Sequence, residues 1–156
     1  MPALDRLPET ARNALLALPV DENETAPFRR PDKPLAESRV AIVTTAGVHL
    51  RSDRPFVPSD PTYRRIPSDA AGADLLQSHN SIGFDRTGIM ADVNVVFPLD
   101  RLREMVAAQR IGSLGAFFYS FMGAQRDASA IKATTAPEVA ARLLEDGVEI
   151  VLLTPT

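Results

Sequence analysis

The stretch Asp92–Gly123, DVNVVFPLDRLREMVAAQRIGSLGAFFYSFMG, predicts a strand, a helix and a second strand in succession. Val93–Phe97 is apolar and rich in β-branched residues, and Pro98 ends it. From Leu99 the apolar residues recur at helical spacing, which indicates an amphipathic helix. Leu114–Tyr119 is apolar again. Two apolar strands joined by one helix are typical of a βαβ unit, whose strands lie parallel and whose crossover is right-handed.

Further elements extend this pattern on both sides. Arg39–Thr45 is a continuous apolar run of the kind found in strands that are buried on both faces. Thr135–Glu138 has the sequence of a capping box with proline in the first turn, which predicts a helix to Asp146. Two more candidate strands are Asp74–His79 and Val148–Leu153.

The alternation of strands and helices predicts an α/β fold, with an open, mostly parallel sheet of about four to five strands and helices on both faces. The expected arrangement is Rossmann-like or flavodoxin-like. After the strand Val148–Leu153 the sequence has only Thr154–Thr156, too little to cover both faces of a buried strand. Three interpretations stay open: an incomplete domain, cover by the amino-terminal helix, or cover by another chain.

The amino-terminal part of the chain differs in composition. Leu4–Leu18 predicts a helix that begins after Pro8, and Pro19–Ser38 is a proline-rich linker. We therefore divide the chain into residues 1–37, a helix and linker, and residues 38–156, the α/β domain. Clusters of Pro, Gly, Ser and Asp predict two long loops, Leu50–Ala73 and Asn80–Ala91.

The composition excludes several classes of protein. The chain has 156 residues and a net charge of −3, which gives no electrostatic reason to expect nucleic acid or an anionic membrane as a partner. No apolar run is long enough to span a bilayer. The first residues, MPALDRLPET, do not have the basic start and apolar core of a signal peptide, so we expect a cytoplasmic protein. There is no cysteine, which excludes disulfides, thiolate metal ligands and thiol redox chemistry from these residues.

Three residues are candidates for acid–base chemistry. His49 follows the strand Arg39–Thr45, at the edge where open α/β sheets bind ligands, and His79 lies near the end of a second candidate strand. If the fold brings them together, the two imidazoles form an acid–base pair; the alternative is two loop histidines bonded to backbone. Tyr119 ends the strand Leu114–Tyr119, and it could act as an acid or make a buried structural hydrogen bond.

Polar residues near the same edge are candidates for binding a small substrate that carries a carboxylate. An arginine there could hold the carboxylate in a bidentate pair, although solvated surface charge is the commoner role of any single arginine. The substrate-binding candidates are Thr44, Thr45, Arg51, Asn80 and Ser120. The other arginines in or beside the first long loop are Arg54, Arg64 and Arg65.

Metal and nucleotide sites have weaker support. Two histidines without a patterned third ligand make a weak metal site. Asp60 or Asp69 would complete one, but turn formation is the commoner use of such residues. Gly112–Gly115, GSLG, does not have the G-x-G-x-x-G spacing of a dinucleotide site, and it opens a strand rather than a helix. We predict no metal and no cofactor in this chain, and a metal-dependent hydrolase is the least favoured interpretation.

Several strings of this sequence occur in the order and at the spacing of a known family. The strings are AIVTTAGVHLRSDRPF, DPTYRRIPSD, SHN, VVFPLDRLREM, YSFMG and LLEDGVEIVLLTPT. On these residues the chain resembles the selenoprotein B family of the glycine, sarcosine, betaine and D-proline reductases, over residues 38–156. The resemblance does not extend to residues 1–37.

The resemblance implies a chemistry and its partners. Known members of the family reductively cleave a C–N bond of an amino acid or N-methylated glycine with electrons from a dithiol, and many act beside a subunit that carries a pyruvoyl group. Their reactive residue is a selenocysteine, or a cysteine in relatives, just after the strand that VEIVLLTP resembles. This sequence ends at Thr156, at or next to that point. Two interpretations stay open: a chain cut short, for instance where a UGA codon meant for selenocysteine is read as a stop, or a small natural subunit that a partner completes.

The function expected from this resemblance is that of a component of an amino-acid reductase-like system, inactive by itself. The alternative is a non-catalytic partner or scaffold subunit, bound to another copy or to a second subunit through its last strand, Val148–Leu153. The apolar character of that strand and of Phe117–Phe121 favours this alternative.

Overall fold

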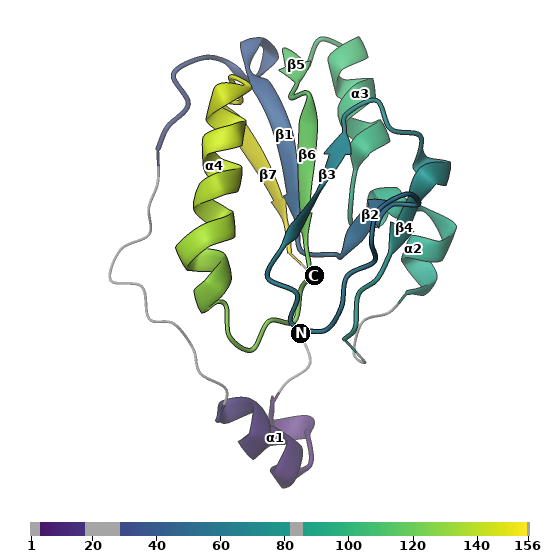
Figure 1. Ribbon diagram of the computed structural model, residues 1–156, viewed down its shortest axis with the longest axis vertical. Coiled ribbons are helices and arrows are strands. Elements are labelled where there is room, and N and C mark those ends of the chain that lie inside the picture. Colours follow the sequence, from purple (N-terminus) through teal and green to yellow (C-terminus); the bar gives the residue numbers. More distant parts are fainter. Residues whose placement is uncertain (1–3, 18–28, 82–85, 156) are drawn as a thin grey trace. The chain divides into compact units, whose positions relative to one another are not determined.

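The computed structural model describes residues 4–17, 29–81 and 86–155 (Figure 1). The chain divides into two compact units, Met1–Arg30 and Pro31–Thr156. The domain boundary placed between residues 37 and 38 stays a prediction. Residues 18–28, which belong to the predicted helix end and linker, lie outside the described residues, and Leu35–Glu37 forms a short 3₁₀ helix, η2.

The described part of the first unit contains two short helices. A 3₁₀ helix, Leu4–Arg6 (η1), comes before the α-helix Glu9–Leu16 (α1). Pro8 occupies the N-cap with extended backbone, and since proline has no N–H to contribute, α1 begins directly after it as the sequence predicts. Neither helix contains a buried residue.

The second unit is built on a five-stranded sheet around a central strand, β1 (Figure 1). β7 lies parallel to β1 along one edge, and β5 and β6 lie parallel to it along the other. β3 adds to β6 in the antiparallel direction. The fold is therefore α/β with an open, mostly parallel sheet, as predicted. The strands are β1 (Arg39–Thr44), β3 (Tyr63–Pro67), β5 (Ser113–Leu114), β6 (Phe117–Phe121) and β7 (Ile150–Thr154).

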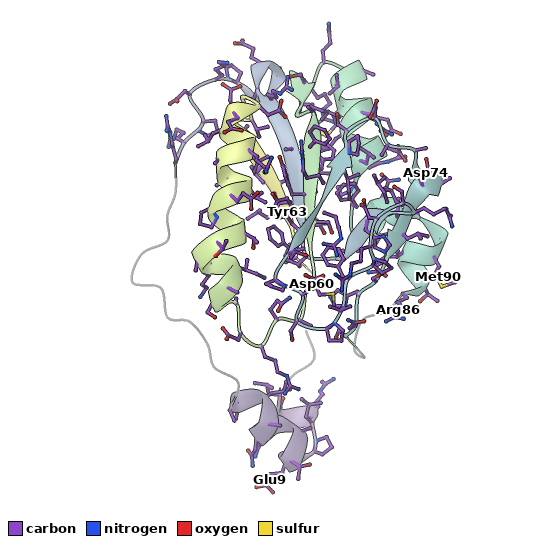
Figure 2. All side chains as sticks on the ribbon, in the orientation of Figure 1. Glu9, Asp60, Tyr63, Asp74, Arg86 and Met90 are labelled. Carbon is purple, nitrogen blue, oxygen red and sulfur yellow. The ribbon has the colours of Figure 1, made fainter. Side chains whose placement is uncertain are left out.

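Helices cover the two faces of this sheet. α3 and the segment before it pack on one face, where the Phe97 and Phe118 rings meet edge-on with centroids 5.9 Å apart. α4 packs on the other face, where the hydroxyl group of Tyr63, labelled in Figure 2, donates to a carboxylate oxygen of Glu138 at 2.7 Å. The helices are α2 (Thr87–Ala91), α3 (Leu99–Ala107) and α4 (Ala136–Glu145).

A second, two-stranded sheet lies beyond the end of β1. Val48–Leu50 (β2) pairs with Leu75–Gln77 (β4) in the antiparallel direction. The strand predicted over Asp74–His79 is thus confirmed, although its partner is β2 rather than a strand of the main sheet. Two 3₁₀ helices flank this region, Gly72–Asp74 (η3) and Val93–Val95 (η4).

The prediction of a strand over Val93–Phe97 is wrong, and with it the βαβ unit over Asp92–Gly123. Val93–Val95 is the 3₁₀ helix η4, because the Asp92 carboxylate accepts a hydrogen bond from the main-chain N–H of Asn94 at 2.9 Å and closes a turn. The apolar residues that follow are buried without joining a sheet; Phe97 is fully buried. The parallel partner of β6 is β1 instead.

Two predicted loops contain regular structure. β3 lies inside Leu50–Ala73, and α2 lies inside Asn80–Ala91. β3 is an edge strand that ends at Pro67, a position where proline is tolerated because its missing N–H is not needed by a neighbouring strand. The prolines around β3 led to the prediction of a loop, although they do not prevent the strand from forming.

The carboxyl-terminal helix is confirmed, but its predicted capping box is not. A turn of π-helix, Ile131–Thr135, leads directly into α4, so Thr135 has helical backbone and its side chain caps nothing. Its hydroxyl group donates instead to the carbonyl oxygen of Pro61 at 2.8 Å. Among the described residues, no helix is both long enough and apolar enough to cross a bilayer.

Candidate functional site

Three hydroxyl side chains stand in one row at the carboxyl ends of the parallel strands. Thr44 of β1 is in register with Ser120 of β6 on one side and with Thr154 of β7 on the other. Cross-strand neighbours in register point to the same face of a sheet. We call Ser120, Thr44 and Thr154 the hydroxyl row.

The hydroxyl row has unused hydrogen-bonding capacity. Thr44 Oγ1 accepts from the main-chain N–H of Ala46 at 3.1 Å and donates to the carbonyl oxygen of Thr154 at 3.1 Å. Ser120 Oγ and Thr154 Oγ1 are buried atoms without a hydrogen-bond partner in the described part of the chain. A buried hydroxyl group without a partner destabilises a fold by about 1–3 kcal/mol, so such groups call for an explanation.

Access to the row differs between its two ends. Ser120 and Thr44 are fully buried, whereas Thr154 is only partly buried. Thr154 is therefore at the less buried end of the hydroxyl row, although its Oγ1 atom is itself buried. The side chain of Thr45, also predicted to bind substrate, points to the opposite face from Thr44, because adjacent residues of a strand face opposite sides. The main-chain N–H of Thr45 donates to the carbonyl oxygen of Thr154 at 3.2 Å.

His49 is buried on β2 and hydrogen-bonded through both ring nitrogens. Nδ1 lies 2.8 Å from the carbonyl oxygen of Leu50, and Nε2 lies 2.7 Å from Ser78 Oγ. A carbonyl oxygen can only accept, so Nδ1 carries the proton and Nε2 accepts from the Ser78 hydroxyl group. This arrangement makes Nε2 of His49 a base that is already oriented toward a hydroxyl group. Ser78 is a polar contact of His49 that our selection of site residues missed, although it stands next to His79 in the sequence.

His79 is buried close to this pair. Its Nδ1 accepts a hydrogen bond from the main-chain N–H of Ser81 at 3.2 Å, and its carbonyl oxygen accepts from Arg86 at 2.6 Å. The main-chain N–H of Ser78 donates to the carbonyl oxygen of Gly47 at 3.0 Å, which fixes the two histidine-bearing segments side by side. Gly47 has a φ of +65°, and a Cβ atom there would lie 3.2 Å from the main-chain nitrogen of His79. The fold thus requires glycine at this close approach.

Tyr119 lies apart from the hydroxyl row. Adjacent residues of a strand point to opposite faces, so Tyr119 faces α4 while Ser120 faces the other way. The Tyr119 ring meets that of Tyr63 edge-on, with centroids 5.7 Å apart. Burial raises the pKa of Tyr119 above its usual value, against the opposing effect of the Arg65 and Arg142 guanidinium groups. Its predicted catalytic role stays a prediction.

The remaining substrate-binding candidates lie at the surface. Arg51 is exposed, and its guanidinium group donates to the carbonyl oxygen of Ala73 at 3.3 Å. Asn80 lines a cavity of about 370 Å³ together with Met122, which follows β6. Asn80 therefore lies near the segment that follows β6, whereas Arg51 lies beside the two-stranded sheet, and both are outside the hydroxyl row.

The guanidinium group of Arg64 is held by contacts within its own loop and is not placed to bind a substrate carboxylate. Its guanidinium group stacks on Phe56 with 4.2 Å between Cζ and the ring centroid, and it pairs with Asp60 at 3.2 Å. Burial by itself would raise the pKa of Asp60, but hydrogen bonds from Thr62 and Arg64 outweigh it and hold the pKa below its usual value. Both carboxylate oxygens of Asp60 thus accept hydrogen bonds from residues of this loop. The described residues contain no group of three His, Asp or Glu side chains placed to hold a metal ion.

The fold and this edge together define an α/β domain that presents polar side chains at the carboxyl ends of its parallel strands, where such sheets bind small ligands. The model of the glycine/sarcosine/betaine reductase selenoprotein B family matches residues 8–156. The chain belongs to that family. The match begins well before residue 38, so it also covers part of the amino-terminal segment that the resemblance of short strings did not reach.

Individual relatives are components of reductases. The chain is 38% identical over 123 residues to the D-proline reductase subunit gamma of Acetoanaerobium sticklandii, which covers 78% of this chain and 50% of the relative. It is 31% identical over 143 residues to the betaine reductase complex component B subunit beta of Peptoclostridium acidaminophilum, which covers 89% of this chain and 32% of the relative. The chain therefore spans half or less of the length of these relatives. No solved structure matches it.

Proposed function

We propose that this chain is a component of an amino-acid reductase system, and that its hydroxyl row binds the carboxylate of a small amino-acid substrate whose C–N bond is cleaved. Membership of the family supports the reaction class. The unpartnered hydroxyl groups of Ser120 and Thr154, on either side of Thr44, are the observation that carries the binding site. Hydroxyl donors to a carboxylate are charge-assisted hydrogen bonds, each worth about 1.5–3 kcal/mol.

The two histidines are suited to transfer protons in such a reaction. Reductive cleavage of a C–N bond takes two electrons and two protons, and one proton must reach the departing nitrogen. Nε2 of His49 accepts a hydrogen bond from the Ser78 hydroxyl group, and Nδ1–H donates to the carbonyl oxygen of Leu50. His49 with Ser78, and His79 beside them, are the groups that we propose to deliver that proton.

The electrons must come from another source. Residues 1–156 contain no cysteine, so we propose that the selenol or thiol of this system lies outside these residues, and that a pyruvoyl group belongs to a partner subunit. The chain by itself is then expected to show no dithiol-dependent reductase activity. The measurement is product formation from glycine, sarcosine, betaine or D-proline with dithiothreitol as donor; turnover above background by the purified chain would contradict this part of the proposal.

Ser120→Ala is expected to weaken binding of the substrate carboxylate about tenfold without destabilising the fold. Removing a buried hydroxyl group that has no partner relieves an unfavourable burial, so the free energy of unfolding should stay equal or rise by up to about 1 kcal/mol. Binding is measured by calorimetric titration of the full chain with each of the four amino-acid substrates.

Thr45→Ala is the matched control, since it removes a hydroxyl group directly after β1 that points to the opposite face from Ser120. It should leave affinity unchanged. Equal affinity of the Ser120→Ala variant and the original chain for every ligand bound would rule out the hydroxyl row as the carboxylate site.

A scaffold role is the second candidate function, and one observation favours it. β7 is the outer strand of the sheet, and Leu153 on β7 and Leu144 on α4 leave 68% and 75% of their surface exposed. Exposed strand edges with large apolar side chains pair readily with other chains. Size-exclusion chromatography with light scattering tests this: a dimer that Leu153→Lys converts to monomer would support it, and a monomer at all concentrations would exclude self-association.

A further inference from the structure

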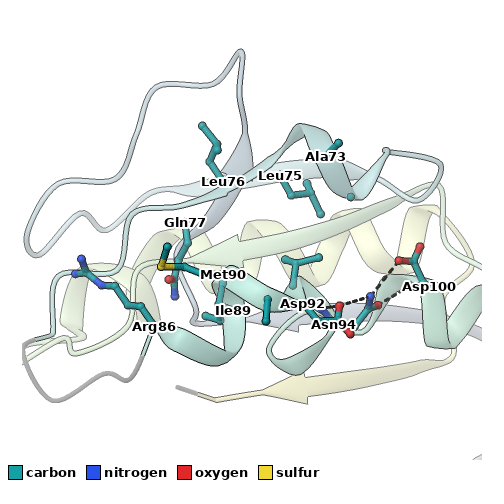
Figure 3. A pocket seen from close by; sticks show the side chains of 13 residues that line it. Ala73, Leu75, Leu76, Gln77, Arg86, Ile89, Met90, Asp92, Asn94 and Asp100 are labelled. Carbon is teal, nitrogen blue, oxygen red and sulfur yellow. Dashed lines mark hydrogen bonds between the residues drawn. The ribbon is translucent and has the colours of Figure 1, made fainter.

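A groove of about 520 Å³ lies between strand β4 and the helices α2 and η4, away from the hydroxyl row (Figure 3). One wall consists of the consecutive residues Leu75, Leu76 and Gln77, and the other includes Ile89 and Met90. Consecutive residues of a strand point to opposite faces, so a wall that contains all three is formed by the edge of β4. We call this cavity the β4 groove.

The edge of β4 that faces away from β2 carries unused main-chain groups. The main-chain N–H of Ser78 donates to Gly47, and that of Arg51 donates to Asp74. In an antiparallel pair every second residue is hydrogen-bonded to the partner strand, so between Asp74 and Ser78 the residue whose main chain bonds to β2 is Leu76. The main chains of Leu75 and Gln77 therefore point outward. The N–H of Leu75 donates to Gly72, which leaves the carbonyl of Leu75 and both groups of Gln77 without a partner in the described part of the chain.

Apolar side chains border this edge and are exposed. Met90 has 85% of its surface accessible and points outward from α2 (Figures 2 and 3), and Leu76 has 38% accessible. Apolar side chains that line a groove beside an open strand edge are typical of surfaces that bind an extended peptide.

The two ends of the groove carry opposite charges. Arg86 lies at the end next to Gln77, whereas Asp92 and Asp100 lie at the other end, joined through Asn94 by hydrogen bonds of 2.8 and 3.0 Å (Figure 3). Asp100 also pairs with Arg103 at 3.0 Å, so Asp92 is the carboxylate that the occupant faces. An occupant that complements both ends has an acidic group toward Arg86 and a basic group toward Asp92.

We propose that the β4 groove binds an extended segment of a partner polypeptide, which pairs with the edge of β4 as an added strand. An apolar side chain of the segment packs between Leu75 and Ile89, an acidic residue faces Arg86, and a basic residue faces Asp92. A polypeptide is the occupant that supplies alternating N–H and C=O groups at the strand spacing that Leu75 and Gln77 present. The printed names of the relatives describe subunits and components of reductases, so partner polypeptides exist for members of this family.

The test uses amide NMR of the full chain titrated with four synthetic peptides. Two have mixed ends, acetyl-Glu-Thr-Val-Thr-Lys-amide and acetyl-Lys-Thr-Val-Thr-Glu-amide, which cover the two strand directions. Two controls have Glu at both ends or Lys at both ends. One mixed peptide should shift the amides of Leu75–Gln77 and Ile89–Val93 and bind about fivefold tighter than either control, as expected for one exposed ion pair. No shift at these amides, or equal binding of a control peptide, would overturn the proposal.

Variants separate main-chain pairing from side-chain contacts. Gln77→Pro removes the outward N–H, which proline at an edge strand permits, and should abolish binding; Gln77→Val keeps the N–H and should retain it. Arg86→Glu should transfer the preference from the mixed peptide to the peptide with Lys at both ends. Retained binding by a folded Gln77→Pro variant would contradict strand addition, and an unchanged preference in Arg86→Glu would contradict the role of the charges.

Two other occupants give distinct results. If the free dipeptide Glu-Lys produced the same shifts at the same concentration, the groove would be a small-molecule site. If the amides of Leu75–Gln77 shifted with protein concentration in the absence of peptide, the occupant would be a second copy of this chain. Either result would overturn the proposal of a partner segment.

Discussion

Phe118→Ala is expected to lower the free energy of unfolding by about 3–5 kcal/mol, the largest loss we expect from any single truncation in the sheet. Phe118, the second residue of β6, is fully buried and packs edge-on against Phe97. Its neighbour in register on β3 is Ile66, which is also fully buried. Truncation would leave a cavity that the fully buried side chains of Ile66 and Phe97 cannot fill. Urea unfolding followed by circular dichroism measures the loss.

Phe117→Ala is the matched control. Phe117 precedes Phe118 on the same strand but faces α4 and is only partly buried, with the Arg65 guanidinium group stacked 4.0 Å from its ring centroid. Loss of that contact and of partial burial should lower the free energy of unfolding by about 1–2 kcal/mol. Because a shift of one residue in register exchanges the two faces of a strand, a larger loss for Phe117→Ala than for Phe118→Ala would contradict the register of β6.

Gly112→Ala is expected to destabilise the protein by about 3 kcal/mol. A Cβ atom at Gly112 would lie 2.6 Å from the carbonyl carbon of Glu37 and 2.9 Å from the main-chain nitrogen of Ser38. These are main-chain atoms, which cannot rotate away as a side chain does. The N–H of Gly112 also donates to the carbonyl oxygen of Ser38 at 3.0 Å, so relief of the clash would break the contact that joins η2 to β5.

Gly88→Ala provides the comparison for this second prediction. A Cβ atom at Gly88 would meet only methyl groups of Val95 at 3.8 and 4.0 Å, which is ordinary contact. Since Gly88 lies in helix α2, alanine there should stabilise the protein by up to about 1 kcal/mol. Thermal unfolding of both variants measures the difference, and equal melting temperatures would contradict the close approach at Gly112.

The elements that the sequence predicts correctly have a clear pattern of apolar residues, and no adjacent side chain favours a different local structure. β1 and β7 are short runs of apolar, mostly β-branched residues, and α3 and α4 repeat their apolar residues at helical spacing. Val93–Phe97 is apolar like β1, but the Asp92 carboxylate accepts a hydrogen bond from the main-chain N–H of Asn94 and stabilises a turn instead of a strand. Composition cannot distinguish these outcomes, because burial favours the same residues in both.

The candidate site is predictable in part for a similar reason. Thr44 and Ser120 end strands that the sequence predicts, and parallel strands bring their carboxyl ends to one edge. That Tyr119 and Ser120 cannot face the same side follows from the alternation along a strand, and this signal was available in the sequence. The third member of the row, Thr154, depends on the register between β7 and β1, which no local pattern reports.

The central claim is that the hydroxyl row binds the substrate carboxylate, and amide NMR of the uniformly labelled chain tests it most directly. We expect titration with glycine, sarcosine, betaine or D-proline to shift the main-chain amides of Thr44–Ala46, Ser120–Met122 and Thr154. Shifts confined to the α4 face, around Arg65 and Arg142, or no shift with any of the four ligands, would contradict the claim.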